Sequence, residues 1–260
     1  MTKALSRSSM TLTGLEGIPL VAPGDDLAAI IGGALDRMNI APEPGDVLVV
    51  AQKIVSKAEN RYRILADVVA SERAKDFAKI LDKDARHIEL ILEESSDVLR
   101  QAGQALITVH RLGFVMANAG IDQSNIEHGE EPGRVLLLPE NPDASAEALK
   151  AALDARYGTD LGVIINDSFG RAWRKGVVGV ALGAAGFPSL RDMVGEPDLF
   201  GRALRITEHA AADEIASAAS LLMGQAAEGV PVVHIRGLNL RGPSAPAAAL
   251  VRPKHQDVFR

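Results

Sequence analysis

The sequence predicts an α+β fold in which mixed sheets are flanked by helices. Short, apolar, β-branched runs such as Val47–Ala51 and Val232–Ile235 are typical of buried strands. Longer stretches with apolar residues at helical spacing, such as 27–38 and 211–226, predict amphipathic helices. Because strands and helices are mixed without the strict alternation of a doubly wound sheet, the α+β class fits better than α/β.

The expected elements follow one another along the chain. Asp25 or Asp26 begins a helix that runs to about Asn39, and the Pro- and Gly-containing segment 42–46 separates it from the strand 47–51. The other expected helices are 71–81, 85–100, 143–157 and 211–226. The other expected strands are 105–109, 113–117, 134–138, 162–165, 177–182, 203–207 and 231–235.

The chain is expected to form one region over residues 1–245, undivided or in two subdomains, followed by a tail over 246–260. The segment after Arg236 is rich in proline and alanine, so we expect it to lie on the surface or to be mobile. The segment 176–186 consists almost entirely of apolar residues and glycine. A strand with two apolar faces needs cover on both, which either helices of the same chain or a partner subunit can provide.

The composition limits the class of protein. The chain has 260 residues, of which 47% are hydrophobic, enough for a sizeable core. No apolar run is long enough to span a bilayer, and residues 1–10 lack the apolar region of a signal peptide, so a cytoplasmic protein without membrane contact is expected. The absence of cysteine excludes disulfides and thiolate metal sites. The net charge of −6 and the 3% aromatic content argue against a nucleic-acid partner.

Two motifs carry most of the chemical information. Asp122 stands in Ala-Gly-Ile-Asp-Gln-Ser-Asn, with no lysine or arginine beside it, and Asp167 stands in Asn-Asp-Ser-Phe-Gly-Arg. Each motif follows an apolar run, 113–116 or 162–165, that predicts a buried strand. A carboxylate there needs a partner charge, and oxygen ligands without cysteine suit Mg²⁺ or Mn²⁺. Such ions keep phosphate oxygens in their shell, so the two motifs predict a metal site beside a nucleotide, although each aspartate alone could equally cap a helix or a turn.

Two further segments are rich in cations. Lys53 and Lys57 follow the strand 47–51; if the strand continues, both share one face and suit a phosphate, and the alternative is a solvated strand end. Arg171 and Arg174 come directly after the second aspartate motif. They form either a solvated basic turn or a clamp for a phosphate beside the metal.

The segment 223–230 ends a helix next to the last expected strand. Its glycines alone would only mark the end of the helix, but Gln225 and Glu228 add side-chain oxygens there. The six histidines show no metal-ligand spacing. Neither a P-loop nor a Rossmann glycine motif is present, so any nucleotide site belongs to another fold.

Five motifs follow one another in order over roughly residues 14–238. They are Gly-Ile-Pro-Leu (17–20), Val-Ser-Lys-Ala-Glu (55–59), Ala-Gly-Ile-Asp-Gln-Ser-Asn (119–125), Asn-Asp-Ser-Phe-Gly-Arg-Ala-Trp-Arg (166–174) and Met-Gly-Gln-Ala-Ala-Glu-Gly (223–229). Together they make the chain resemble the coenzyme F420-0:L-glutamate ligase family, also called F420-0 γ-glutamyl ligases. The resemblance implies that family's α+β fold, which is neither P-loop nor Rossmann and forms an intertwined homodimer.

The resemblance also implies an activity. Family members use GTP and divalent metal to add L-glutamate to the deazaflavin coenzyme F420-0, and further γ-linked glutamates to F420-n, through an acyl phosphate, with release of GDP and phosphate. The ions implied are Mg²⁺ or Mn²⁺, one or two of them, with K⁺ as a further candidate. The metal ligands implied are Asp122, Asp167, Ser168 and Gln225. The GTP site implied comprises Gly17, Ile18, Pro19, Leu20, Lys57, Asn125, Met223, Gly224, Gln225, Glu228, Gly229 and Val230.

We expect Lys57 to neutralise phosphate charge, together with Arg171 and Arg174, whose role we infer from their charge and position alone. Two positions depart from the family pattern. Gln52 stands where the family often has serine or threonine, which leaves one nucleotide contact open, and Asn60 replaces a glycine, a mild change because asparagine tolerates a left-handed backbone. Two other functions therefore stay open: a nucleotide-binding regulatory protein without turnover, and a ligase of the same chemistry acting on another carboxylate.

Overall fold

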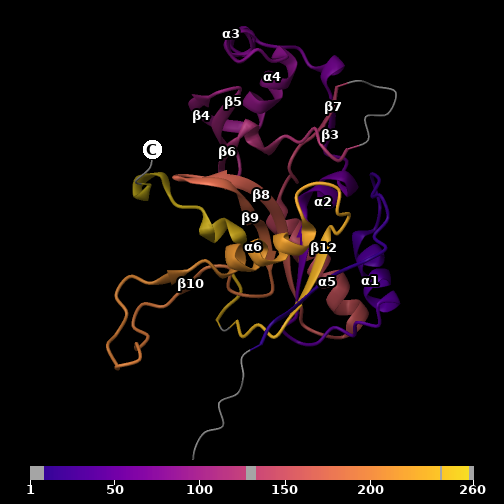
Figure 1. The fold of residues 1–260 in the computed structure, drawn as a ribbon, viewed down its shortest axis with the longest axis vertical. Helices are drawn as coiled ribbons and strands as arrows, with labels where there is room; N and C mark the ends of the chain where they lie inside the picture. Colours follow the sequence, from indigo (N-terminus) through magenta and orange to yellow (C-terminus); the bar gives the residue numbers. More distant parts are fainter. Residues whose placement is uncertain (1–8, 127–132, 241, 258–260) are drawn as a thin grey trace, which may run out of the picture.

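The computed structural model describes residues 9–126, 133–240 and 242–257. At its centre lies a five-stranded sheet in the order β1-β12-β2-β8-β9 (Figure 1). These strands are β1 (Thr11–Gly14), β12 (Val232–Arg236), β2 (Val47–Ala51), β8 (Gly162–Arg171) and β9 (Arg174–Ala185). Only β2 and β8 run parallel, and the other neighbours are antiparallel. The sheet is therefore mixed, and the predicted α+β class is confirmed.

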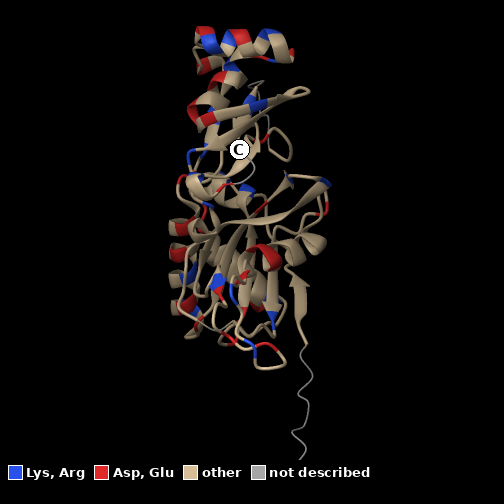
Figure 2. Ribbon diagram, turned by 90° about the vertical axis from the view of Figure 1, so that its left-hand side faces the viewer, with Lys and Arg blue, Asp and Glu red and all other residues tan. Residues whose placement is uncertain are grey.

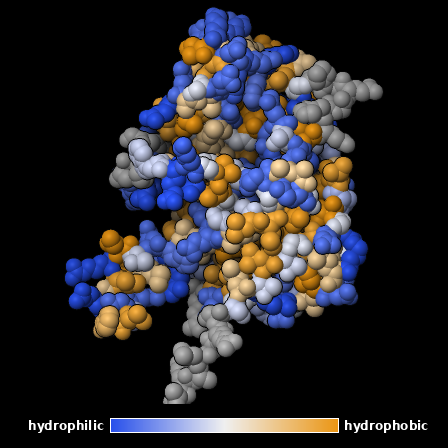
Figure 3. Space-filling model, viewed as in Figure 1, coloured by the Kyte–Doolittle hydropathy of each residue, from blue (hydrophilic) through white to orange (hydrophobic). Residues whose placement is uncertain are grey.

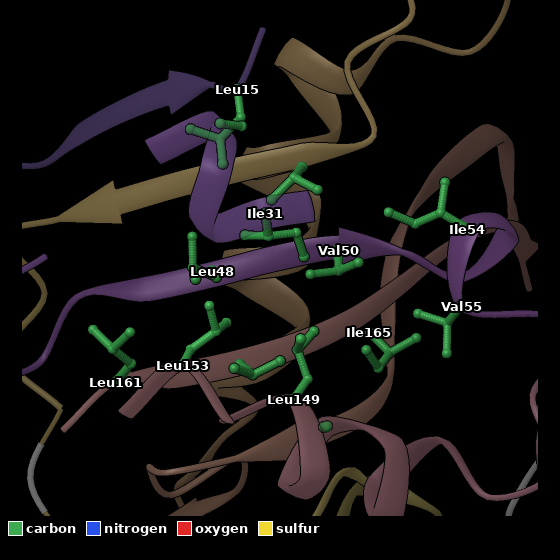
Figure 4. Close-up of a cluster of buried hydrophobic side chains, with 14 of the residues drawn as sticks. Leu15, Ile31, Leu48, Val50, Ile54, Val55, Leu149, Leu153, Leu161 and Ile165 are labelled. Carbon is green, nitrogen blue, oxygen red and sulfur yellow. The ribbon is translucent and has the colours of Figure 1, made fainter. Parts of the chain in front are cut away.

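Apolar side chains cover both faces of the central sheet. Successive residues of β2 point to opposite sides, so that Leu48 joins one core cluster and Val49 the other, and both are buried. The helices that cover these faces are α1 (Leu27–Arg37) and α5 (Pro142–Tyr157) on the first side, shown in Figure 4, and α6 (Ala211–Met223) on the second. Burial on both faces is the reason that β2 is an uninterrupted apolar run.

A second group of elements lies beyond one end of the central sheet, at the top of Figure 1. It contains α3 (Glu72–Leu81), α4 (Ala85–Glu93), the three-stranded sheet of β4 (Ser95–Ala102), β5 (Ala105–His110) and β6 (Val115–Ala117), and the paired strands β3 (Tyr62–Ile64) and β7 (Arg134–Leu136). Its core includes Leu81 and Ile88. A small cluster of Met116, Leu138 and Leu182 connects this group to the central sheet. Acidic and basic residues are interspersed along the outer helix α3, at the top of Figure 2.

Several predicted helix boundaries are confirmed by capping contacts. Asp26 begins α1, because its Oδ1 accepts the N–H of Ala29 at 3.0 Å. Ser71 precedes α3 and accepts the N–H of Ala74 at 3.2 Å. Gly158 ends α5 with a φ of 64°, which glycine adopts without strain.

None of the helices in the described ranges is long and apolar enough to cross a membrane.

The condition under which the two lysines would share a strand face, a strand 47–51 that continues through them, is not met. The chain turns directly into helix α2 (Gln52–Ala58). Helical spacing places Gln52 and Ser56 one turn apart on the buried side, where the Ser56 hydroxyl donates to Gln52 Oε1 at 2.9 Å. These buried polar groups are satisfied by each other, which a strand would not allow.

Three other predicted elements differ from the structure. The helix predicted over 85–100 ends at Glu93, because the Ser95 hydroxyl donates to the carbonyl of Ile91 and the chain continues as β4. The strand predicted over 203–207 is absent, and Ala203 forms only an isolated bridge with Pro197, which has no N–H to donate to a ladder. The pairing forms instead between β10 (Arg191–Asp192) and β11 (Glu208–His209). Finally, the strand before Asp122 is β6, a half-exposed edge strand and not a buried one.

Residues 190–209 form an arm that projects from the body in Figure 1. Leu199 and Phe200 are 99% and 95% exposed, and Ile206 is nearly as exposed. Figure 3 shows apolar side chains on this arm, away from the core. Exposed apolar side chains gathered in this way are typical of a surface that contacts another molecule.

The buried part of β9 is covered by helices of its own chain. A methyl group at Gly179 would collide with the carbonyl of Ala216 in α6, and one at Gly183 would collide with the carbonyl of Pro142 in α5. Glycine is required at both places because helix backbone packs directly on the strand. The cover expected over residues 176–186 is therefore provided within the chain from Gly179 onward, whereas Val177 is 49% exposed.

The segment after β12 lies largely on the surface, as predicted, and is anchored there at one buried position. Ala247 is fully buried within the short 3₁₀ helix η3 (Ala247–Leu250). The N–H groups of Ala247 and Ala248 donate to the carboxylate of Asp143 at 2.7 and 3.1 Å. This carboxylate at the start of α5 holds the C-terminal segment against the second face of the sheet.

Candidate functional site

A cleft of about 960 Å³ opens where the carboxyl ends of β2 and β8 face the second group of elements. Its lining comes from the segments 18–23, 51–57, 122–126, 166–168 and 220–231, together with Tyr62, Arg134 and Val177. Parallel neighbours such as β2 and β8 deliver the residues that follow them to the same edge of a sheet. The strand β12 runs antiparallel to β2 and begins at that edge. The segment between the end of α6 and β12 therefore lies at the same edge. All five sequence motifs meet in this cleft.

Asp122 and Asp167 form the acidic part of the cleft. Burial is the main cause that raises the pKa of Asp167 to about 7, and the negative charge of Asp122 is the second cause. The N–H of Ser168 donates to Asp167 Oδ1 at 2.8 Å and only partly opposes this shift. The repulsion of the Asp167 charge by that of Asp122 is the kind of interaction that a bound divalent cation relieves.

Two residues that sequence reasoning did not assign to the metal site hold Asp122. Gln52 Nε2 donates to Asp122 Oδ2 at 2.6 Å, and Lys53 Nζ forms an ion pair with Asp122 Oδ1 at 2.5 Å. The expectation from sequence neighbours that no cation lies beside Asp122 is therefore wrong. The helical spacing of Gln52 with Ser56 and of Lys53 with Lys57 could have indicated the helix, but not its contact with Asp122. Both lysines line the cleft, as predicted, but they share a helix face and not a strand face.

A chain of hydrogen bonds joins two of the predicted nucleotide-site residues, Lys57 and Asn125, to the loop after α6. Lys57 Nζ donates to the carbonyl of Asn125 at 2.8 Å. The Asn125 side-chain amide in turn donates to the carbonyl of Ala226 at 2.9 Å. The structure thus connects α2, the loop after Asp122 and the loop after α6 along one wall of the cleft.

The other wall joins β8 to the loop after α6. The Ser168 hydroxyl donates to Gln225 Oε1 at 2.8 Å, so these two predicted metal ligands are adjacent. Asn166 also lines the cleft, and its buried Oδ1 has no hydrogen-bond partner among the residues that the structure describes. Its Nδ2 is held by Ser220 Oγ at 3.2 Å, which fixes the orientation of the amide.

The two predicted glycine-containing loops, 17–20 and 223–230, contribute most but not all of their predicted residues to the lining of the cleft. Ile18, Pro19 and Leu20 line the cleft, whereas Gly17 lies behind them with a φ of 69° and its carbonyl accepts from Arg37 at 2.9 Å. The predicted residues of the second loop that line the cleft are Met223, Gly224, Gln225, Gly229 and Val230.

Glu228 does not line the cleft but stabilises the second loop. Its carboxylate accepts the N–H of Ala226 at 2.8 Å, and this backbone hydrogen bond is the main reason that its pKa is lowered. Gly224 has a φ of 71°, and a side chain at that position would collide with the Glu228 carboxylate. Glu228 therefore shapes the loop that the neighbouring residues present to the cleft.

Arg171 and Arg174 are not brought into the cleft of their own chain. They lie on either side of the turn between β8 and β9, where Arg174 is exposed and Arg171 donates to the carbonyl of Gly176 at 3.4 Å. The turn contains Trp173, which is itself exposed. A contact between these arginines and a phosphate in the cleft stays a prediction.

The residues at the acidic end of the cleft fit a hard divalent cation. Asp122 and Asp167 supply carboxylate oxygens, and Ser168, Gln225 and Asn166 supply neutral oxygens. Within the described ranges no group of three or more His, Asp or Glu side chains is placed to hold a metal. An ion held here would therefore complete its shell with water and phosphate oxygens, a ligand set typical of Mg²⁺ and Mn²⁺ in nucleotide sites.

Comparison with known proteins identifies the family of this chain. The family described as F420-0:Gamma-glutamyl ligase matches residues 17–237. This chain belongs to the F420-0:γ-glutamyl ligase family. The coenzyme F420:L-glutamate ligase of Methanothermobacter thermautotrophicus is 45% identical over 254 residues, which cover 96% of this chain and 99% of that protein. The enzymes of the same name from Methanopyrus kandleri and Archaeoglobus fulgidus are 45% and 43% identical, and the aligned parts cover 95% of this chain in both cases and 97% and 94% of the respective relatives.

The match to the F420-0:γ-glutamyl ligase family contains every segment that lines the cleft. The family resemblance predicted from the five motifs is confirmed. Of the two departures from the family pattern, Asn60 has a φ of 54°, so asparagine does adopt the left-handed backbone there. The other departure, Gln52, is buried behind Asp122 and orients that carboxylate.

Proposed function

We propose that this F420-0:γ-glutamyl ligase family member is an amide ligase that joins L-glutamate to coenzyme F420-0, and further γ-linked glutamates to F420-n, with GTP as co-substrate. The observation that carries the proposal is the cleft in which residues from all five motifs meet, among them a carboxylate pair, neutral oxygens and Lys57. Support also comes from the relatives named coenzyme F420:L-glutamate ligase, which the chain matches over nearly their whole length.

The proposed chemistry begins with activation of a carboxylate, because an oxide ion does not leave an acyl carbon. A carboxylate oxygen of the acceptor attacks the γ-phosphorus of GTP, the bond to the GDP oxygen breaks, and an acyl phosphate and GDP result. The amine of glutamate then attacks the acyl carbon, the bond to the phosphate oxygen breaks, and the nitrogen loses a proton. The products are an amide and inorganic phosphate. Neither step needs a covalent bond to the protein, so the residues act by positioning and charge neutralisation.

The roles follow the two walls of the cleft. Asp122, Asp167, Ser168 and Gln225 would hold one or two Mg²⁺ or Mn²⁺ ions, which supply positive charge to the phosphates, and K⁺ is a further candidate. Lys57 would neutralise phosphate charge from the opposite wall, where Asn125 fixes its ammonium group. The loops 17–20 and 223–230 would surround the nucleotide.

We also propose a homodimer, for which the support is the arm 190–209. Its exposed Leu199, Phe200 and Ile206 need an apolar surface that the rest of the described chain does not offer them. A second copy would provide that surface. A role for Arg171 and Arg174 in phosphate binding then depends on the partner, since their turn does not reach the cleft of its own chain.

The test is mass spectrometry of F420-0 after incubation with the protein, GTP, Mg²⁺ or Mn²⁺, and L-glutamate. We expect a mass gain of one or more glutamyl units that requires every component, with one GDP and one phosphate formed per amide bond. Asp167→Asn is the matched inactive variant. Unmodified F420-0 together with phosphate release that is independent of acceptor and glutamate would contradict the ligase and favour a nucleotide-binding protein without ligation.

A further inference from the structure

A stacked pair of side chains lines the cleft and has no role in the assignments above. The guanidinium carbon of Arg134 lies 3.6 Å from the ring centroid of Tyr62. Arg134 belongs to β7 and Tyr62 to β3, and both are half-buried in the cleft wall. Neither residue belongs to the five motifs.

Strand pairing places this pair beside Asp122. Leu136 pairs with Tyr62 on one side and with Asp122 on the other, where two backbone hydrogen bonds of 2.9 and 3.0 Å join it to Asp122. Adjacent strands are about 5 Å apart, so the backbone positions of Tyr62 and Asp122 are separated by roughly 10 Å. Residues directly opposite each other face the same side of a sheet, and Arg134, two residues before Leu136, shares that side. The guanidinium is therefore within reach of a small substrate held at the carboxylate pair.

The stacking prepares the guanidinium to bind a planar anion. A ring against one face of the group limits its rotation and leaves the N–H donors in the guanidinium plane free for an edge-on partner. A carboxylate matches this edge with two parallel hydrogen bonds. Among the described residues Arg134 makes no ion pair, whereas Arg61, Arg111 and Arg236 each contact a carboxylate of the protein.

We propose that Arg134, held by Tyr62, binds a carboxylate of a substrate, either one of L-glutamate or one of the acceptor. The inference rests on the proposed function and deepens it. In that reaction only the acceptor carboxylate that becomes the amide carbonyl loses its charge, and the α- and γ-carboxylates of the incoming glutamate stay anionic. Lys57, the two aspartates and the loop after α6 lie along the walls assigned to the nucleotide and ion, so the Arg134 edge is left for a carboxylate substrate.

The test compares Arg134→Gln with Arg63→Gln. Arg63 lies next to Tyr62 in the same strand but does not line the cleft, and its ion pair with Glu93 is exposed. Mass spectrometry first establishes ligation by the wild-type protein, and KM is then measured separately for L-glutamate, for F420-0 and for GTP. We expect Arg134→Gln to raise KM for one of the two carboxylate substrates by about 10- to 100-fold. The KM for GTP should change less than about twofold, and Arg63→Gln should change none of the three.

The two possible sources of the carboxylate give different results. A raised KM for L-glutamate alone assigns Arg134 to the amino acid, and a raised KM for F420-0 alone assigns it to the acceptor. Arg134→Lys keeps the charge but loses the planar donors and the stacking, so it should fall between wild type and Arg134→Gln. A change confined to GTP, or unchanged KM values in a variant with wild-type circular dichroism, would overturn the inference while leaving the ligase intact. A wild-type protein that forms no glutamyl product would overturn both.

A second variant keeps the inference falsifiable if Arg134→Gln does not fold. Tyr62→Leu retains the cation and a similar apolar volume but removes the ring that orients it. We expect Tyr62→Leu to raise the same KM that Arg134→Gln raises, but by only about two- to tenfold. Stacking of a guanidinium on an aromatic ring contributes binding energy on this scale. A Tyr62→Leu protein with wild-type KM values for both carboxylate substrates would show that the stack has no part in binding.

Discussion

Protonation of Glu94 is expected to destabilise the protein at low pH. The side chain of Glu94, at the end of α4, is only 13% exposed, and the nitrogens of Arg111, His110 and Arg61 lie 3.1, 3.3 and 3.5 Å from its oxygens. Burial alone would raise the pKa of Glu94. The contacts with His110, Arg111 and Arg61 outweigh burial and lower the pKa to about 2.

The size of the effect follows from the difference between the folded and unfolded states. Lowering the pKa from 4.5 to about 2 on folding corresponds to about 3 kcal/mol of stability, at roughly 1.4 kcal/mol per pH unit. Because the folded-state pKa lies below the unfolded one, this contribution is fully present above pH of roughly 5 and is lost as the pH falls towards 2. About 2 kcal/mol of it should be lost between pH 6 and pH 3.

Urea unfolding of the wild-type protein and of Glu94→Gln at a series of pH values measures this contribution. The free energy of unfolding of the wild type should fall by about 2 kcal/mol more than that of Glu94→Gln between pH 6 and pH 3. The matched control is Glu93→Gln, since Glu93 pairs with Arg63 in a contact where both side chains are 43% exposed. That variant should retain the wild-type pH dependence to within about 0.5 kcal/mol. An identical pH dependence in Glu94→Gln and wild type would refute the assignment.

The carboxylate pair leads to two further expectations and the exposed arm to a third. Asp167→Asn should abolish glutamyl transfer yet raise the melting temperature of the metal-free protein at pH 8, because a carboxyl group whose pKa is raised to about 7 destabilises the folded state once it is charged; a lowered melting temperature would argue against this. GTP and Mg²⁺ together should raise the melting temperature by more than the sum of their separate effects, since a shared ion links the two bindings, and simple additivity in a thermal-shift assay would count against a shared site. Leu199→Asp and Phe200→Asp should each convert the proposed dimer to a monomer in light scattering, whereas a monomeric wild type at micromolar concentration would disprove the dimer.

Local patterns were sufficient where local physics decides the structure. Asp26 and Ser71 begin helices and Gly158 ends one, each through local contacts. The strand β2 is apolar because both of its faces are buried. These elements were therefore predicted correctly. The turn into α2 was not, because Ile54 and Val55 are compatible with a strand and only packing against the first core cluster selects the helix. Where packing against a segment distant in sequence selects the secondary structure, the local sequence pattern contains no signal for it.

The same distinction applies to the site. Asp122 and Asp167 could be found because acidic residues after apolar runs are unusual wherever they occur. Lys53 could not be recognised as the partner of Asp122, because their contact depends on α2 and on the pairing of Asp122 with β7. Arg134 and Tyr62 are brought together only by the pairing of β7 with β3. Non-local strand pairing of this kind is not visible in either segment alone.

The position of β12 between β1 and β2 affects how the chain can fold during its synthesis. The first strand of the central sheet has no neighbour until the last one has left the ribosome, because β1 pairs with β12 alone. Until then both β1 and one side of β2 present unpaired backbone groups, the kind of edge that recruits other chains. The segment 220–231, which closes the cleft, is also among the last to emerge. A ligand of the cleft can therefore stabilise the chain only late in its synthesis, and a product truncated before Val232 would leave β1 without a partner strand and one side of β2 unpaired.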